Sequence, residues 1–439
     1  MDFKALAKTY STPLYIYDFD DITSRYTALK SAFNAHKSLI CYAVKANSNL
    51  SLLKHLAGLG AGFDCVSGGE VRRALLAGAK PYQVIFSGVG KSDEELEFAI
   101  KSDILFINVE SDSELEALMK VAKNLGKKAR ISIRVNPNVD AKTHPYISTG
   151  LSENKFGVSI DVARAMYLKA NESEFIEPVG VHFHIGSQLS ELAPIAEAAG
   201  IVSEFMASLK AAKIDIKFFD VGGGIGIVYY DEKTISLYEY AQAILAALKS
   251  QDVTIVCEPG RFIVGEAGYF LTKVLYEKQN DKKRFVIVDG AMNDLIRPSL
   301  YNAYHEVVAV SDGLSVSELK AKCQNAKSRQ ETSGQSKETS QNQDEKTSGL
   351  NLIPADVVGP VCESGDFLAK NAPLPPLKSG DLIVFRCAGA YGFSMSSNYN
   401  TRARAAEVAI IGDESRLIRS RESFEDMVKN EIEFIKAQK

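Results

Sequence analysis

The chain has 439 residues, 46% of them hydrophobic and 24% charged, so it can bury one large core and a second domain. Its formal net charge of −4 gives no reason to expect a nucleic acid or an anionic membrane as partner. No apolar run reaches the roughly 18 residues that span a bilayer, and the N-terminus lacks the apolar segment of a signal peptide, so we expect a cytoplasmic protein.

Eight short apolar runs occupy the first three-fifths of the chain, and helical stretches separate most of them. The runs are 38–47, 62–67, 84–90, 104–110, 129–136, 178–187, 217–224 and 254–261. Strand-helix alternation indicates a parallel sheet, and eight repeats predict a closed (β/α)8 TIM barrel, which we expect to cover residues 27–265. The active sites of such barrels lie at the C-terminal ends of the strands.

Start and stop signals mark several of the intervening helices. Ser92 with Glu95, and Ser111 with Glu114, each match a capping box, in which two side chains satisfy free amides at a helix start. The stretch that follows Glu114 has apolar residues at helical spacing and reaches Gly126, a typical C-terminal cap. We therefore predict a helix start at Ser92 and a helix between Ser111 and Gly126.

The pattern changes after about residue 266, where apolar runs follow one another with turns between them. This spacing predicts an antiparallel β domain made of residues 266–439 together with 1–26, because the N-terminal run 13–18 can add a strand. A short terminal helix is expected from residue 424. Residues 321–349 are almost free of apolar side chains, so we expect a disordered polar insertion.

Six scattered cysteines without a CxxC pair support neither a disulfide framework nor a zinc site, and no metal is expected. The ends of the predicted barrel strands carry the chemistry instead. They hold Lys45, Asp64, Arg134, His184, Gly222, Gly223, Gly224, Glu258 and Arg261. A lysine for an aldehyde, a glycine loop for a phosphate, a carboxylate for a ring nitrogen and a flat histidine ring together match the needs of pyridoxal phosphate.

The motifs in which these residues stand resemble the diaminopimelate decarboxylase family, pyridoxal-phosphate enzymes that pair an alanine-racemase-like barrel with a β domain. The motifs are YAVKAN, FDCVSGGE, HFHIGSQ, DVGGGIG, EPGR, DGAMNDLIRPSLY, CESGD and GAYG. They run in order from about residue 13 into the C-terminal region, interrupted by the polar insertion. The resemblance implies decarboxylation of meso-2,6-diaminopimelate at its D-centre to L-lysine and CO2, the last step of lysine biosynthesis.

The resemblance also implies a role for each matching residue. Lys45 would form a Schiff base with pyridoxal 5'-phosphate, Glu258 would pair with the ring nitrogen, and His184 would lie against the ring. The other cofactor-binding residues would be Asp64 and Arg134 at the lysine end, with Ser187, Gly222, Gly223, Gly224, Pro259, Gly260, Arg261 and Tyr391 around the phosphate. His182 has no assigned role, and packing alone would explain it.

For the substrate, the resemblance implies that Arg261, Arg297 and Tyr301, with Tyr391 nearby, bind the distal carboxylate. Glu363 would bind the distal ammonium, and Cys362 would return a proton to the reacting carbon. The family's pattern implies a homodimer with shared active sites, in which Cys362, Glu363 and Tyr391 come from the other subunit.

Other interpretations remain open from the residues. Taken alone, Arg297 could be a surface salt-bridge partner, Cys362 a buried filler, and His144 part of a lid. The whole chain could be a same-fold decarboxylase of ornithine, arginine or carboxynorspermidine, although Glu363 and the arginine set argue against it. A racemase would not need Glu258, and a non-catalytic pyridoxal-phosphate-binding regulatory protein would not need Lys45 and Cys362.

Overall fold

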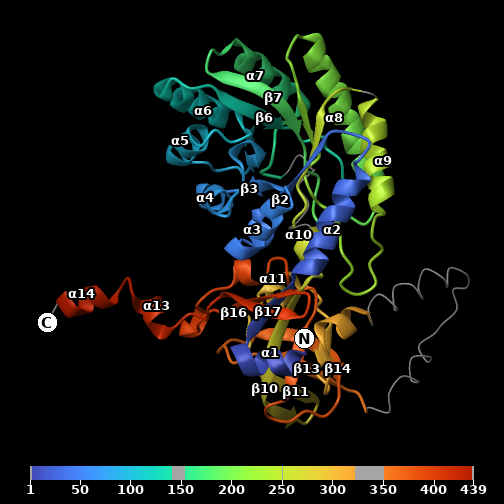
Figure 1. Ribbon diagram of the computed structural model, residues 1–439, viewed down its shortest axis with the longest axis vertical. Coiled ribbons are helices and arrows are strands. Elements are labelled where there is room, and N and C mark those ends of the chain that lie inside the picture. Colours follow the sequence, from blue (N-terminus) through green and yellow to red (C-terminus); the bar gives the residue numbers. More distant parts are fainter. Residues whose placement is uncertain (1, 141–153, 250, 322–350, 438–439) are drawn as a thin grey trace, which may run out of the picture. The chain divides into compact units, whose positions relative to one another are not determined.

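The computed structural model describes residues 2–140, 154–249, 251–321 and 351–437, which form two compact units (Figure 1). One unit is Asp21–Glu266, and the other joins Met1–Asp20 to Ala267–Lys439. His144 and all but the first residue of the predicted insertion 321–349 lie outside the described residues. Within these ranges no helix is both long and apolar enough to cross a membrane.

The first unit is the predicted barrel, and each of the eight apolar runs overlaps one of its strands. The strands are β2 Ser38–Ala43, β3 Gly62–Cys65, β4 Val84–Phe86, β5 Phe106–Val109, β6 Ala129–Arg134, β7 Ile176–His182, β8 Phe218–Asp220 and β9 Thr254–Cys257. Each pairs in parallel with the next, and β9 closes the barrel by pairing with β2, where Ser38 lies opposite Ile255. The predicted fold class is confirmed for this unit.

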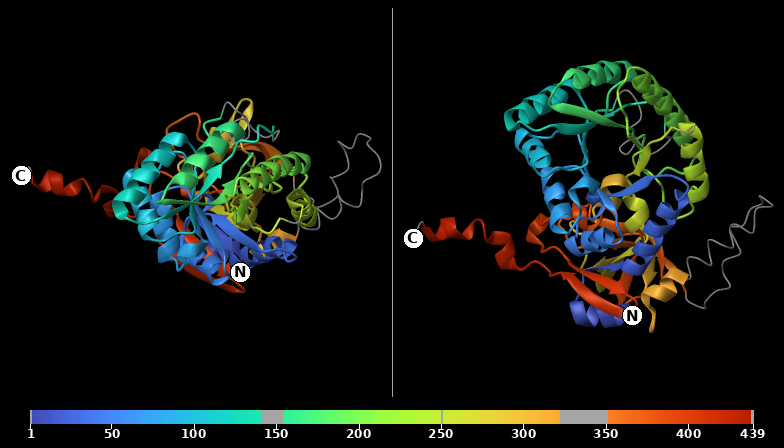
Figure 2. Two further views of the ribbon diagram at one scale, coloured as in Figure 1. Left: turned by 90° about the horizontal axis from the view of Figure 1, so that it is seen from above. Right: turned by 45° about the horizontal axis from the view of Figure 1, so that its top comes forward.

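Helices surround these strands as a ring (Figure 2). They are α2 Phe19–Ala32, α3 Leu50–Gly58, α4 Gly68–Leu76, α5 Asp93–Lys101, α6 Asp112–Leu125, α7 Ile160–Glu172, α8 Ala193–Ala211, α9 Leu237–Leu248 and α10 Arg261–Val264. Short 3-10 turns follow β2, as η1 Val44–Ala46, and precede β4, as η2 Pro81–Gln83. The helices cover the outer face, so the buried interior of the barrel is left to the inward side chains of the strands.

The two predicted capping boxes differ in the structure. Helix α5 has the complete box, because Ser92 accepts from the Glu95 amide and Glu95 accepts from the Ser92 amide. At α6, Ser111 accepts from the amide of Glu114, but Glu114 instead binds the Glu110 amide and the Lys91 ammonium. The second box is therefore only half formed, because a buried lysine competes for the carboxylate. As predicted, α6 ends at Gly126, which adopts a left-handed conformation with φ +60°.

The second unit is built on a sheet with nine strands among the described residues. Its strands are β1 Leu14–Asp18, β10 Gly268–Asn280, β11 Lys283–Val288, β12 Val307–Ala309, β13 Ile353–Val358, β14 Phe367–Leu374, β15 Leu382–Phe385, β16 Ala406–Ile411 and β17 Glu414–Arg419. The order is β14-β13-β11-β10-β1-β16-β17, with β15 paired to β10 and β12. The N-terminal strand thus joins this sheet, as predicted.

The sheet is mixed rather than purely antiparallel. Strand β1 runs parallel to β16, and β11 runs parallel to β13, while the other pairs are antiparallel. Parallel neighbours require a long connection. The first pair has the whole barrel between its strands in sequence, and the second has α11 Arg297–Tyr301, β12 and the segment 322–350 between them. The antiparallel expectation came from short turns, which say nothing about strands far apart in the chain.

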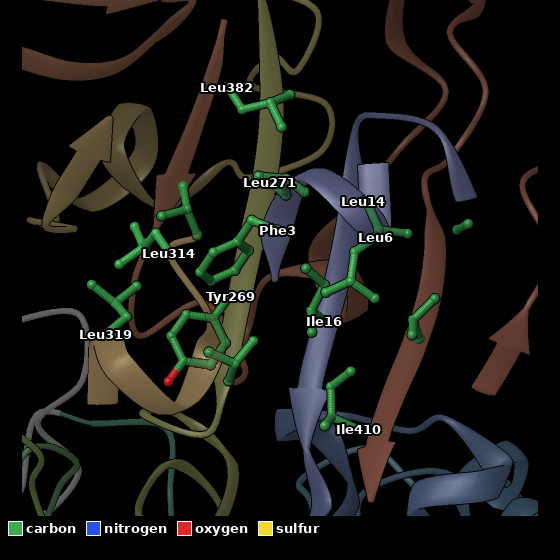
Figure 3. Close-up of a cluster of buried hydrophobic side chains, with 14 residues drawn as sticks. Phe3, Leu6, Leu14, Ile16, Tyr269, Leu271, Leu314, Leu319, Leu382 and Ile410 are labelled. Carbon is green, nitrogen blue, oxygen red and sulfur yellow. The ribbon is translucent and has the colours of Figure 1, made fainter. Parts of the chain in front are cut away.

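A hydrophobic core holds this sheet to the N-terminal helix α1 Phe3–Tyr10 (Figure 3). Phe3 and Leu6 of the helix pack against Leu14 and Ile16 of β1 and against Leu271 of β10, and all five side chains have no exposed surface. The helix begins at Asp2, whose carboxylate accepts from the Ala5 amide. The predicted terminal helix is split into α13 Phe424–Val428 and α14 Ile432–Ala437.

Candidate active site

The interior of the barrel is apolar towards the N-terminal ends of its strands and polar towards their C-terminal ends. Three strands make this change over two residues, from Ile85 to Ser87, from Phe106 to Asn108 and from Val256 to Glu258. The first residue of each pair belongs to one hydrophobic cluster. Residues two apart on a strand point to the same side, so the second residue of each pair extends the same inward row. We call the buried set Asp64, Ser87, Asn108, His182, Asp220 and Glu258 the polar layer.

Hydrogen bonds link one side of the polar layer into a chain. The Ser87 hydroxyl donates to Oδ1 of Asp64 at 2.7 Å. Nδ2 of Asn108 donates to Oγ of Ser87 at 3.0 Å and approaches Oε1 of Glu258 at 3.5 Å. A carboxylate after β9 is thereby connected to one on β3 through residues of β4 and β5.

The carboxyl groups of the polar layer differ in charge. Burial and the charge of Glu258 raise the pKa of Asp64 to about 8, although Lys45 opposes the shift. Burial and Glu258 also raise the pKa of Asp220 well above its usual range. Burial acts against ionisation of Glu258 too, but His182, His184 and Lys45 outweigh it and lower its pKa to about 2. Negative charge in the layer is therefore favoured on Glu258 and disfavoured on Asp64 and Asp220.

Lys45 lies in turn η1, directly after β2, and its side chain is exposed between buried Val44 and Ala46. The turn packs on the loop that follows β9. A side chain at Gly260 would place its Cβ 3.1 Å from that of Ala46. Because glycine leaves room there, the lysine turn can lie against the loop that carries Glu258.

The glycine loop after β8 is in close contact with the loops on either side. Gly222 has φ +65°, and a Cβ there would lie 2.6 Å from the Phe183 carbonyl oxygen. A Cβ on Gly223 would lie only 2.2 Å from the carbonyl oxygen of Glu258. Backbone without side chains is therefore required at this point, and a loop without side chains allows a phosphate group to approach closely.

His184 is fixed as a neutral ring beside this loop. The Gly223 amide donates to its Nδ1 atom at 3.2 Å, which places the ring proton on Nε2. Burial, with help from the charges of Arg134 and Lys45, lowers the pKa of His184 well below its usual value. An uncharged flat ring at this position can stack against an aromatic cofactor.

Two buried arginines flank these residues. Nη1 of Arg134 contacts both carboxylate oxygens of Glu110, at 3.1 and 3.2 Å, and its guanidinium lies 4.7 Å from the ring centre of Phe156. Arg261 donates to the hydroxyls of Tyr229, at 2.7 Å, and Ser187, at 3.2 Å. The second arginine thus ties together the loops after β7, β8 and β9.

The β unit carries the other predicted site residues. Arg297 opens α11 and is buried, and Nε2 of His305 lies 3.0 Å from its Nη1; Tyr301 ends the same helix. Cys362 and Glu363 are exposed; the amide of Cys362 donates to Asn400, and Glu363 accepts from the Tyr399 hydroxyl at 2.8 Å. Tyr391 is half-buried, with φ +57°.

Several residues of the barrel site were not predicted from the sequence. Ser87, Asn108 and Asp220 complete the polar layer, and Glu110 holds Arg134. A signal existed for Asn108, a lone amide within the apolar run 104–109. Donor atoms of His182, Asp220 and Glu258 also lie within 4.8 Å of one another, a spacing that a metal ion could use; the expectation of no metal stays a prediction.

The barrel residues fit pyridoxal phosphate. The glycine loop has no room for side chains, a neutral histidine adjoins it, and one carboxylate keeps its negative charge in a buried layer. A pyridine ring nitrogen that must stay protonated needs such an anion as partner. Lys45 lies close enough to influence the pKa values of Asp64, His184 and Glu258, so the amine and the anion occupy one site.

Comparison with known proteins agrees with this site. The family described as pyridoxal-dependent decarboxylase, pyridoxal binding domain, matches residues 19–265. The diaminopimelate decarboxylase of Campylobacter jejuni is 57% identical over 438 residues, covering 100% of both chains. A crystal structure of diaminopimelate decarboxylase from Helicobacter pylori, complexed with L-lysine, has a TM-score of 0.88 and 52% identity, covering 99% of this chain and 100% of that one. With such identity over its full length, the chain belongs to the diaminopimelate decarboxylase family.

Proposed function

We propose that this protein is a carboxy-lyase that removes CO2 from the D-centre of meso-2,6-diaminopimelate, with pyridoxal 5'-phosphate as cofactor, and releases L-lysine. The observation that carries the proposal is the ionised, buried Glu258 beside a side-chain-free glycine loop, at the barrel end that also holds Lys45. Full-length identity to proteins named diaminopimelate decarboxylase supports the substrate.

Within the barrel, Lys45 would hold the cofactor covalently, and Asp64 and Arg134 would orient that end of it. Glu258 would hold a proton on the ring nitrogen, and His184 would support the ring face. The phosphate would be bound by Ser187, Gly222, Gly223, Gly224, Pro259, Gly260, Arg261 and, from the β unit, Tyr391. When bound, the cofactor supplies an electron sink for the pair of electrons left when CO2 departs.

The other proposed residues act on the substrate. Arg261, Arg297 and Tyr301, with Tyr391, would bind its distal carboxylate, and Glu363 would bind its distal ammonium. Fixing both distal charges orients the D-centre, and orientation of this kind can contribute several kcal/mol to lowering the barrier, on the order of 7 in favourable cases. Cys362 would then return a proton to the reacting carbon, because its thiol is exposed and so accessible to a bound ligand.

The assembly and location are part of the same proposal. The protein would be a cytoplasmic homodimer in which Cys362, Glu363 and Tyr391 of one subunit complete the site of the other. Exposed positions for Cys362 and Glu363 support this, because a residue that serves a partner's site must be accessible on its own chain. The domain boundaries inferred from sequence, 27–265 for the barrel and 1–26 with 266–439 for the β domain, belong to this proposal too.

The test is to incubate the purified protein with pyridoxal phosphate and meso-diaminopimelate and to quantify lysine and CO2. We expect equal amounts of both products. The LL isomer has no D-centre and serves as the matched control, which should remain unreacted. Ornithine, arginine and carboxynorspermidine tested in parallel would identify a different decarboxylase. Turnover of one of these without turnover of the meso compound would refute the proposed substrate.

A further inference from the structure

His182 lies in the polar layer, yet no role in cofactor or substrate binding has been assigned to it. It ends strand β7, where it lies opposite Asp220, the last residue of β8. Both side chains are almost completely buried, with exposed fractions of 1% and 0%. A histidine in such a place needs a polar partner, since burying an imidazole without one costs free energy.

The partner is Glu258. Nε2 of His182 lies 3.3 Å from Oε2 of Glu258, on the opposite side of the carboxylate from Asn108, which approaches Oε1 at 3.5 Å. A carboxylate can only accept hydrogen bonds, so the ring proton belongs on Nε2. Neither Nδ1 nor Nε2 of His182 meets full hydrogen-bond geometry with a described residue, so the contact of Nε2 with Glu258 is a close approach of 3.3 Å.

The other acidic groups of the layer also bear on the charge of Glu258. Asp64 and Asp220 are both buried near Glu258, and negative charge on either would act against charge on Glu258. Oδ1 of Asp220 already accepts from the Gly222 amide at 3.0 Å. Of the groups around Glu258, His182 has the largest effect in favour of the ionised carboxylate, before His184 and Lys45.

We propose that His182 is a positioning residue for Glu258: through Nε2 it holds this carboxylate in place and ionised, and so keeps the proton on the cofactor's ring nitrogen. The inference rests on the proposed function and deepens it. His182 would touch neither cofactor nor substrate. Its influence on the reaction would pass entirely through Glu258.

A pH dependence follows, and several titratable or charged groups surround the pair formed by His182 and Glu258. They are Asp64 on β3, Arg134 on β6, His184 after β7, Asp220 on β8 and Lys45 after β2. Activity that needs an ionised Glu258 is present above the pKa of Glu258 and is lost as the pH falls through that value. Because removal of His182 raises this pKa, the acid limb of the kcat profile should move to higher pH.

Three variants of the holoenzyme separate the donor from the shape of the side chain. His182→Leu fills the space without a donor, His182→Gln places an N–H near the position of Nε2, and His182→Asn is too short to reach Glu258. Ser132→Ala is the matched control, because Ser132 is a buried polar residue of the same barrel outside the Glu258 contacts. Each variant is loaded with cofactor labelled with 15N at the ring nitrogen, whose NMR shift reports whether that nitrogen carries a proton.

For His182→Leu we expect the ring-nitrogen shift to move towards the unprotonated value and kcat to fall about tenfold to a hundredfold, the effect of one hydrogen bond to a charged group. KM should change by less than about threefold, since the substrate contacts remain. His182→Gln should lie close to wild type, and Ser132→Ala should match it. If His182→Leu does not fold, comparing His182→Gln with His182→Asn gives the same test, since only the Gln side chain can bring a donor to Glu258.

Several results would overturn the inference. One is that His182→Leu keeps the ring-nitrogen shift and the acid limb of the wild type. Another is that the Gln and Leu variants lose the same amount of kcat, and a third is that Ser132→Ala loses as much kcat as His182→Leu. Stoichiometric divalent metal in the wild type that disappears with His182 would show a metal site instead. A wild-type protein that neither binds the cofactor nor releases lysine would refute the proposed function, so the two failures are distinguishable.

Discussion

The two units of this protein carry their functional residues in different ways. In the barrel, the candidate residues are buried, linked by short hydrogen bonds and tuned in charge, as in the chain from Asp64 to Glu258. In the β unit, Cys362 and Glu363 lie exposed on a loop whose contacts are local, such as that of Glu363 with Tyr399. The difference is what we expect if the cofactor half of the proposed site lies mainly in the barrel, whereas the substrate half also uses residues on an exposed surface.

The largest effect is expected at Lys45, where the barrel's chemistry is concentrated. Lys45→Ala should lower kcat more than about a thousandfold, because covalent cofactor attachment and an amine near Glu258 are both lost. In the wild type, borohydride reduction followed by peptide mapping should place the cofactor on the YAVKAN peptide. Lys54→Ala, an exposed lysine of α3, is the control and should keep both label and activity. A label on any other lysine would refute the assignment.

A smaller but selective effect is expected at Glu363. Glu363→Gln keeps the shape and removes the charge that would pair with the distal ammonium, so kcat/KM for diaminopimelate should fall about a hundredfold or more. The absorption spectrum of the bound cofactor should stay normal, because its ligands lie mainly in the barrel. Tyr399→Phe removes the hydrogen bond to Glu363 but leaves its charge, and should cost much less. An altered cofactor spectrum in Glu363→Gln would show that Glu363 also affects cofactor binding, so that the cofactor and substrate halves of the site are not independent.

The third effect concerns stability rather than activity and tests the charge pattern of the polar layer. The pKa of Asp64 is raised to about 8, so between pH 4 and 8 the folded state keeps a proton that the unfolded chain loses. Wild-type stability should therefore fall with rising pH relative to Asp64→Asn, by up to about 1.4 kcal/mol per pH unit. Denaturant unfolding of cofactor-free protein measures this, with Asp281→Asn in an exposed turn as control. A constant difference across the window would mean that Asp64 is already ionised.

Sequence reasoning predicted the barrel well and its interior incompletely. Strand ends could be located because most of the apolar runs stop at a polar residue, and parallel strands bring those ends to one edge. The contacts inside the barrel could not be predicted, because the approach of Asn108 to Glu258 depends on closure of strands that are 150 residues apart. The half-formed capping box at Ser111 could not be predicted for the same reason, since Lys91 binds the Glu114 carboxylate from an earlier loop. The two parallel strand pairs of the second sheet could not be predicted either, because they are joined by long connections.

Mixing two inactive variants tests the division between the halves most directly. Lys45→Ala and Glu363→Gln are each purified, combined, dissociated under mild denaturant and allowed to reassemble. In a symmetric dimer with shared sites, half of the reassembled dimers are mixed and each has one intact site, so about a quarter of wild-type activity should return. If the reassembled mixture stays inactive while each variant alone is folded and dimeric, Glu363 acts within its own chain and the account of a shared site is wrong.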